Sequence, residues 1–380
     1  MRRPSTCLAW MILAASCAPD AEPRQGLSVA QALGGGEAAD LDGFDRAFAV
    51  RDFEFPADHG PHPGFRSEWW YFTGNAFGEG GRRFGYHVTF FRTATRPEPE
   101  PAGGSDWRTN QLWMAHFAVV DVASGQSHAA ERFARGALGL AGASAAPFEA
   151  HVDAWSVRSA EPGAFGPLRL EAADGGFAVD LTLEPQKPVV LQGDRGLSQK
   201  GPEPGNASHY YSLTRLGVSG TIRFDGEDVT IASGTGWFDR EWSTSALGAG
   251  QVGWDWFALH LEDGRDLMWY QLRREDGSTD TLSSGTLVAK DGSARRLAAT
   301  DVVLEPLGTW TSPRSGAAYP AGFRLRIPGQ GLDLRVDAAV SDQELDLTFR
   351  YWEGAVDVSG SHPGHGFLEM TGYADLGAGR

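Results

Sequence analysis

The sequence predicts an all-β protein made of two copies of one antiparallel unit. From Phe65 onward, short runs alternate apolar and polar residues at period two, the spacing that turns one face of a strand to a core. Gly, Pro, Asn and Asp-Gly separate the runs, and 50 glycines supply such hairpin turns along the whole chain. Three segments also recur in the same order in both halves. Strands at this density indicate a barrel or a sandwich.

Residues 1–17 have the pattern of an export signal. Arg2 and Arg3 precede the apolar run Leu8–Ala15, which is too short to span a bilayer as a helix. "LAASC" then resembles a bacterial lipobox, in which Cys17 is lipidated and becomes the mature N-terminus; a plain cleaved signal is the alternative. Because Ala18 rather than Asp follows the cysteine, we expect an exported lipoprotein that is attached to the outer membrane, faces the periplasm and touches the membrane by its lipid anchor only.

Residues 18–50 are expected to form a tether with a short helix at Leu27–Leu33. The chain has two cysteines, and Cys7 lies in the segment to be removed, so a mature protein would have no disulfide, zinc-thiolate site or cysteine nucleophile. The net charge of -16 argues against nucleic-acid binding, which requires a basic face. No cofactor is expected.

The recurring segments indicate an internal duplication. The three matched pairs, first copy then second, are "WWYF" (69–72) with "WDWF" (254–257), "HVTFFR" (87–92) with "MWYQLR" (268–273), and "YSLTRLGVSG" (211–220) with "YWEGAVDVSG" (351–360). In each half the last segment is followed by a glycine, an aromatic residue, an apolar residue and an acid, "GWFD" (236–239) and "GFLE" (366–369). Their order and spacing predict an N-terminal domain over 51–243 and a C-terminal domain over 250–378.

The first copy of the aromatic strand separates its side chains between two faces. Glu68, Trp70 and Phe72 share one face of the expected strand, and Trp69 and Tyr71 share the other. One of these faces is expected to pack in the core, and the other aromatic residues are candidates for the wall of a site.

The second copy has an acid where the first copy has its second tryptophan. Asp255 lies between Trp254 and Trp256 in an otherwise apolar strand. Burial would raise its pKa, and a neutral carboxylic acid can donate a proton. The alternative is a structural aspartate that is paired with Arg273 or Arg240.

"GWFDREWS" (236–243) carries a second group of charges. Asp239 and Glu241 share one face of a strand, and Arg240 points to the other. Asp239 is therefore a second candidate catalytic acid, but the same cluster at the junction of two domains could be a structural ion pair.

"DHGPHPGF" (58–65) contains two histidines that are three residues apart. Pro61 and Pro63 exclude a helix, and no metal-binding motif accompanies His59 and His62, so a rigid loop is favoured over a metal site. His59 remains a candidate for hydrogen bonding or proton transfer if this loop borders a cavity.

Thirteen tryptophans exceed what a core of this size needs. Aromatic side chains that line a barrel suit a long apolar or polyene ligand, and their faces stabilise a cation that develops on it. The candidate ligand-binding residues are Trp70, Tyr71, Trp237, Trp254, Trp256, His59 and Glu68.

Several motifs in order resemble one known family. "FPADHGPHPGFRSEWWYFTGNA", "GWFDREW", "GWDWFALHLEDGRDLMWYQLR" and "YWEGAVDVSG…GFLEMTGYA" are similar to the lipocalin-like family of bacterial carotenoid 1,2-hydratases and of secreted predicted hydrolases encoded with ABC-transporter components. The resemblance implies two lipocalin-like antiparallel β-barrel domains. The lipobox and the intact "DHGPHPGFRSEWWYFTGN" are more similar to the transporter-associated branch.

Two functions follow from the residues and the resemblance together. The first is binding of a hydrophobic small molecule (a lipid, terpenoid or polyene), in partnership with an envelope ABC transporter. The alternative is a hydro-lyase, in which Asp255, or else Asp239, protonates a terminal C=C and Trp237, Trp254 and Trp256 stabilise the cation. A hydrolase has no nucleophile motif in its support. Whether the site lies inside one barrel or between two is left open.

Overall fold

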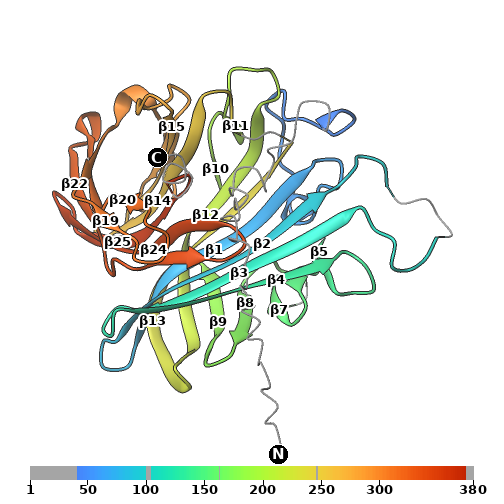
Figure 1. The fold of residues 1–380 in the computed structure, drawn as a ribbon, viewed down its shortest axis with the longest axis horizontal. Helices are drawn as coiled ribbons and strands as arrows, with labels where there is room; N and C mark the ends of the chain where they lie inside the picture. The colour runs from blue at the N-terminus through green and yellow to red at the C-terminus, as the bar shows by residue number, and fades with distance from the viewer. Residues whose placement is uncertain (1–40, 100–103, 162, 245–246, 374–380) are drawn as a thin grey trace, which may run out of the picture.

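The computed structural model describes residues 41–99, 104–161, 163–244 and 247–373, and nearly all of its regular structure is β (Figure 1). The predicted all-β class is confirmed. The expected export signal, Cys17 and the short helix at Leu27–Leu33 lie outside the described residues. Within the described ranges, no helix has the length and apolar character needed to cross a membrane.

The first sheet is a nearly closed antiparallel barrel. Its strands run in the order β4-β3-β2-β1-β13-β12-β9-β8-β7-β6-β5, with β10 and β11 paired to β12. The bounds are β1 Ser67–Gly78, β2 Arg83–Ala94, β3 Gln111–Asp121, β4 Gln126–Arg135, β5 Ala141–Ala145, β6 Phe148–Val152, β7 Trp155–Ser159, β8 Leu168–Asp174, β9 Phe177–Pro185, β10 Val190–Leu191, β11 Leu197–Gln199, β12 Ala207–Phe224 and β13 Glu227–Ser243.

The second sheet forms a half-barrel, seen in orange and red in Figure 1. Its order is β17-β16-β15-β14-β25-β24-β22-β21-β18, with β23 paired to β24, and β19 and β20 pair separately. The bounds are β14 Gln251–Leu261, β15 Asp266–Arg274, β16 Ser284–Val288, β17 Ala294–Ala298, β18 Val303–Leu307, β19 Trp310–Thr311, β20 Ala318–Tyr319, β21 Gly322–Ile327, β22 Leu332–Ala338, β23 Glu344–Asp346, β24 Arg350–Gly360 and β25 Gly364–Met370; three short 3-10 turns are η2 Ala57–His59, η3 Ala299–Asp301 and η4 Pro328–Gln330.

The matched sequence segments occupy matching places in the two sheets. β1 lies between β2 and β13, and β14 lies between β15 and β25. β12 lies next to β13, as β24 lies next to β25. The same four-strand arrangement is thus built twice, and the change of sheet falls between Ser243 and Gln251.

Strand alternation divides the aromatic side chains between the barrel interiors and the layer where the sheets meet. Trp70 and Phe72 are fully buried in the core of the first sheet, and Phe257 is fully buried in the core of the second. Tyr71 and Trp256 point to the opposite faces and meet edge to face, with ring centroids 5.0 Å apart. The aromatic pattern at period two therefore supplies both cores and the contact between them.

A glycine allows the two sheets to approach closely. A Cβ on Gly85 in β2 would lie 2.8 Å from the Ala355 Cβ in β24 and 2.7 Å from the Val120 Cγ1. Real Cβ contacts do not come so close, so any side chain here would push the two sheets apart.

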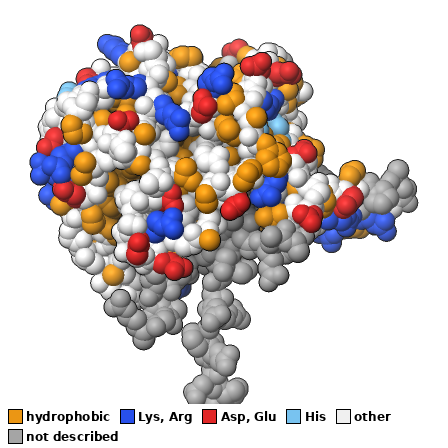
Figure 2. All heavy atoms as spheres, turned by 90° about the horizontal axis from the view of Figure 1, so that it is seen from above, with side chains coloured by type: hydrophobic (Ala, Val, Ile, Leu, Met, Phe, Trp, Pro, Cys, Tyr) orange, Lys and Arg blue, Asp and Glu red, His pale blue; other side chains and the backbone are white. Residues whose placement is uncertain are grey.

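On the face in Figure 2, basic and acidic side chains are interspersed and form no continuous basic field. This agrees with the acidic net charge of the chain.

Candidate active site

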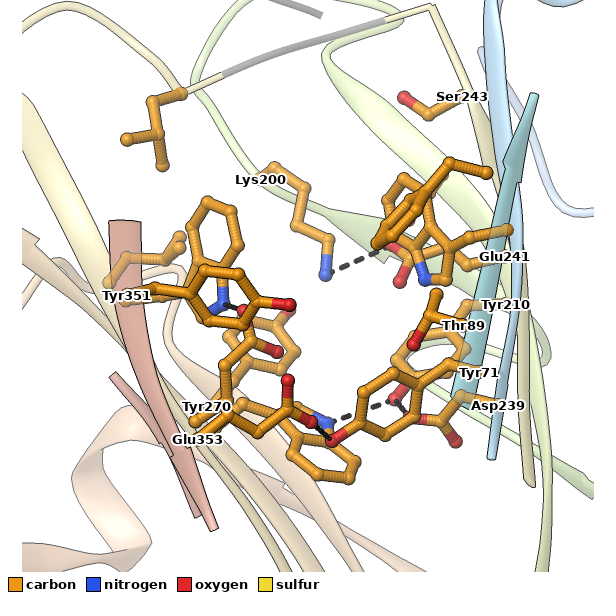
Figure 3. Close-up of a pocket in the computed structure, with 18 of the residues that line it drawn as sticks. Tyr71, Thr89, Lys200, Tyr210, Asp239, Glu241, Ser243, Tyr270, Tyr351 and Glu353 are labelled. Atoms are coloured by element: carbon orange, nitrogen blue, oxygen red, sulfur yellow. Dashed lines mark hydrogen bonds and ion pairs between the residues drawn. The ribbon is translucent and has the colours of Figure 1, made fainter. Parts of the chain in front are cut away.

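A cavity of about 130 Å³ lies between the two sheets (Figure 3). Side chains from β1, β2, β12 and β13 line one side, and side chains from β14, β15, β24 and β25 line the other. Its aromatic lining comprises Trp69, Tyr71, Phe91, Tyr210, Trp254, Trp256, Tyr270 and Tyr351. The site is therefore formed where the outer faces of the two units meet.

Asp239 on β13 is a buried carboxyl in this cavity. Tyr210 Oη donates to Oδ2 and Ser212 Oγ donates to Oδ1, each at 2.5 Å, and Trp237 Nε1 donates to Oδ1 at 2.7 Å. Burial raises the pKa of Asp239 to about 7, although these three hydrogen bonds favour the charged form. Near neutral pH this group can therefore either accept or hold a proton.

Glu353 on β24 and Glu369 on β25 are register partners on adjacent strands. Burial raises the pKa of Glu369 to about 8, while the Trp254 indole donates to its Oε1 at 3.1 Å. Burial, and then the neighbouring Glu369, raises the pKa of Glu353 well above its usual value. The pair resembles a carboxyl dyad, in which two groups that lie side by side do not both ionise at neutral pH.

Tyr71 joins the two groups of carboxyls. It lies opposite Asp239 in the β1–β13 register, and its hydroxyl donates to Glu353 Oε1. Burial, followed by Glu353 and Glu369, raises the pKa of Tyr71 well above its usual value, so it stays a neutral donor. On the Asp239 side, the Trp256 indole donates to Tyr210 Oη at 3.2 Å.

An ion pair occupies another side of the cavity. Lys200 Nζ lies 3.2 Å from Glu241 Oε1, and Ser208 Oγ donates to the same carboxylate oxygen. Nζ also lies 4.0 Å from the centre of the Tyr270 ring and 5.4 Å from that of Tyr210. Although burial opposes its charge, the Glu241 carboxylate raises the pKa of Lys200, so the lysine is a cation.

Five residues expected in the site from the sequence lie in or directly beneath this cavity. Asp239, Tyr71, Trp254 and Trp256 line it. Trp237 lies beneath it, hydrogen-bonded to Asp239 and packed edge to face on Trp256.

Asp255, the first candidate acid, lies on the other face of β14. It is fully buried, its Oδ2 lies 3.3 Å from Arg273 Nε, and Tyr373 Oη donates to Oδ1 at 3.1 Å. Burial raises its pKa to about 6, against the opposing effect of Arg273. The period of the strand turns Asp255 away from the cavity lined by Trp254 and Trp256, and its surroundings are those of the Arg-paired alternative.

Trp70, His59 and Glu68 are also placed away from the cavity. Trp70 is fully buried inside the first barrel and stacks on Trp113 at a centroid distance of 5.5 Å. His59 Nδ1 lies 2.6 Å from Tyr211 Oη, and the ring stacks on Phe165 at 3.6 Å.

Glu68 has a structural environment of its own. It is completely buried and forms ion pairs with Arg92 and Arg240, while the backbone N–H of His62 donates to Oε2 at 3.0 Å. These arginines, above all Arg240, hold the pKa of Glu68 well below its usual range although burial opposes this. Glu68 therefore links the histidine-containing loop 58–65 to Arg92 on β2 and Arg240 on β13.

Sequence reasoning missed the site roles of Lys200, Tyr210, Glu353 and Glu369. A signal for one of them was present, because the repeat aligns Asp239 with Glu369 and the structure places both carboxyls in the cavity. Glu353 lies in another matched segment. Lys200 comes from the end of the short β11 region, which has no counterpart among the matched segments, and the sequence offers no comparable signal for it.

This arrangement combines aromatic faces with buried carboxyls whose pKa values are raised toward or above neutrality. A neutral carboxylic acid can protonate an apolar substrate, a group of lower pKa can take a proton from water, and the rings can stabilise positive charge. Among the described residues, no group of three or more His, Cys, Asp and Glu side chains is placed to hold a metal ion.

Comparisons with known proteins agree with this architecture. Residues 46–373 match the AttH-like family model. An AttH-type protein from Nitrosomonas europaea has 34% identity and a TM-score of 0.76, over 87% of this chain and 100% of that one. Kievitone hydratase from Nectria haematococca (17% identity, TM-score 0.65, 87% and 97% coverage) and CghA (14%, 0.50, 88% and 97%) share the fold. No curated protein matches the chain.

Proposed function

The chain belongs to the AttH-like family, and we propose that it adds water to a carbon–carbon double bond of an apolar substrate bound between its two sheets. The observation that carries the proposal is that two buried carboxyls, Glu369 and Asp239, lie in one cavity walled by aromatic rings, where burial raises their pKa values to about 8 and about 7. Kievitone hydratase, which shares the fold, is named for a hydration, and this adds support by analogy only.

In the proposed reaction, Glu369 is the general acid. Its carboxyl O–H transfers a proton to one alkene carbon, and the π electrons form the new C–H bond. The positive charge that remains on the other carbon is stabilised by the faces of Trp254 and Trp256. The oxygen of a water molecule forms the C–O bond, and Asp239 takes the proton that this water releases. Proton exchange with solvent restores both carboxyls, so alkene plus water gives an alcohol.

Glu353 and Tyr71 would support this acid. The high pKa of Glu353 keeps the dyad at one negative charge or fewer, and the Tyr71 hydroxyl holds Glu353 in place from the opposite sheet. The specific substrate that we propose is an acyclic terpenoid, which would be hydrated at its terminal C=C, as in the carotenoid 1,2-hydratases that the sequence resembles. The proposed general acid is thus Glu369 rather than Asp255, which the sequence favoured, and Asp239 is assigned as the group that accepts a proton from water.

The test is turnover in water labelled with oxygen-18. The purified protein is incubated with a panel of acyclic terpenoid alkenes, and mass spectrometry measures alcohols that contain one labelled oxygen. Glu369→Gln is expected to lower the rate by about 10²- to 10⁴-fold, the usual contribution of a general acid. Glu275→Gln, at an exposed site, is the matched control. Unchanged turnover by Glu369→Gln would show that Glu369 is not the general acid.

A second candidate is non-catalytic binding of the same class of apolar ligand. The aromatic lining supports it, and the export signal and lipobox expected at residues 1–17 favour an exported lipoprotein that partners an envelope ABC transporter. Mass spectrometry of ligands that co-purify with the protein from an envelope fraction tests this candidate. A bound apolar molecule, recovered unchanged after incubation with the protein, together with no labelled alcohol, would favour binding over hydration.

A further inference from the structure

We infer that the substrate is amphipathic and carries an anionic oxygen group, such as a carboxylate or an enolate, which Lys200 binds at the side of the cavity away from Glu353 and Tyr71. This inference deepens the proposed function, on which it rests, because it names the substrate class of the same cavity. An apolar hydrocarbon alone would make no use of this cation, whose charged partner in the cavity is the Glu241 carboxylate.

Lys200 differs from the other lysines of the chain. There are three: Lys187 is buried against Asp266 with Nζ 2.7 Å from Oδ2, Lys290 is exposed, and Lys200 lines the cavity. Within the described part of the chain, Lys200 is the only Lys or Arg among the lining residues. Its side chain lines the cavity and keeps 21% of its surface exposed.

The electrostatic surroundings of Lys200 allow it to bind an anion. The Glu241 carboxylate is its nearest charged partner, and the Ser208 hydroxyl also donates to that carboxylate. Glu241 would therefore keep a donor if the flexible lysine turned toward a ligand. Asp239, Glu353 and Glu369 have raised pKa values, which lowers the negative charge that an anionic ligand would meet.

The positions of Lys200 and the carboxyl dyad define how the ligand would be oriented in the cavity. In Figure 3, Lys200 points into the cavity from the side opposite the Tyr71–Glu353 contact. An anion on Nζ would place the adjoining part of the ligand over Tyr270, whose ring centre lies 4.0 Å from Nζ. The apolar remainder would then extend along the aromatic walls toward the carboxyl dyad, where the proposed chemistry takes place.

Two fluorescent probes that share a ring system test the inference. 1-Anilinonaphthalene-8-sulfonate carries an anionic group, and N-phenyl-1-naphthylamine lacks it. For Lys200→Met, we expect the Kd of the sulfonate to rise about tenfold, while the Kd of the neutral probe stays within twofold. Glu241→Gln, which removes the competing carboxylate, should lower the Kd of the sulfonate. Lys200→Arg should keep most of the preference for the anion.

Lys290→Met is the matched control and should leave both Kd values unchanged. Near-ultraviolet circular dichroism checks that each variant keeps its tertiary packing. Equal changes for both probes in Lys200→Met, or no change for the sulfonate, would overturn the inference. If selective binding of the sulfonate is found while no labelled alcohol forms, the anion site stands and hydration falls. If labelled alcohol forms but the sulfonate is not bound selectively, hydration stands and the anion site falls.

Discussion

Replacing Glu369 by Gln tests whether its carboxyl is neutral in the folded protein. In the unfolded chain this group ionises near its usual pKa of 4.5, whereas in the folded protein burial raises the pKa to about 8. The unfolded state therefore loses its proton first as pH rises, so wild-type stability falls between about pH 4.5 and 8 and stays lower above that range. At 1.36 kcal/mol per pKa unit, the full difference is about 5 kcal/mol.

Glu369→Gln cannot ionise, but it keeps a carbonyl oxygen to accept the Trp254 indole N–H. Its free energy of unfolding should therefore lack this fall. The measurement is urea unfolding, followed by tryptophan fluorescence at pH 5, 7 and 9, for wild type, Glu369→Gln and the exposed control Glu275→Gln. The stability of the variant relative to wild type should increase from pH 5 to about pH 8 and then level off. Parallel pH profiles for wild type and Glu369→Gln would refute a raised pKa and, with it, the assignment of the acid.

Three further variants separate structural residues from site residues. Arg240→Met leaves Glu68 buried with one of its two guanidinium partners missing, so urea unfolding should show a loss of about 3 to 5 kcal/mol. Gly85→Val places side-chain atoms against Ala355 in the other sheet, so we expect a loss of about 1 to 3 kcal/mol and weaker binding of N-phenyl-1-naphthylamine. Asp255→Asn alters a group outside the cavity, so alcohol formation and probe binding should stay within twofold of wild type.

Each of these expectations has a clear contrary result. A loss below about 1 kcal/mol for the Arg240 variant would mean that Glu68 has solvent or other partners. Unchanged probe binding in the Gly85 variant would mean that the shape of the cavity does not depend on the contact between β2 and β24. Abolished alcohol formation in a folded Asp255 variant would return the catalytic acid to the position first expected from the sequence.

The period of the strands made much of the architecture predictable. Alternation in "FRSEWWYF" assigns Trp70 and Phe72 to one face and Tyr71 to the other, and the structure places the first two in the core and Tyr71 in the cavity. The same rule applied to "GWFDREW" puts Asp239 and Glu241 together, and both line the cavity. Alternation succeeds here because a strand has two faces, and each side chain is assigned by its position alone.

Alternation does not tell which face of a strand looks into a barrel and which looks toward the other unit. Asp255 and Trp70 were expected in the site, yet they lie on the interior faces of β14 and β1. Glu353 reaches Tyr71 only because two sheets far apart in sequence pack together. Burial raises the pKa values of Asp255, Glu353 and Tyr71, and sequence spacing does not describe burial.

The sequence by itself determined the β class, the repeated unit and the two faces of each aromatic strand, because these depend on local periodicity and on self-similarity. The tertiary structure alone decided that the outer faces of the two units meet, and it thereby collected Asp239, Glu353, Glu369 and Lys200 around one cavity. Their chemistry follows from that contact, since removal from water raises the pKa values of Asp239, Glu353 and Glu369, and the same contact places Lys200 beside them.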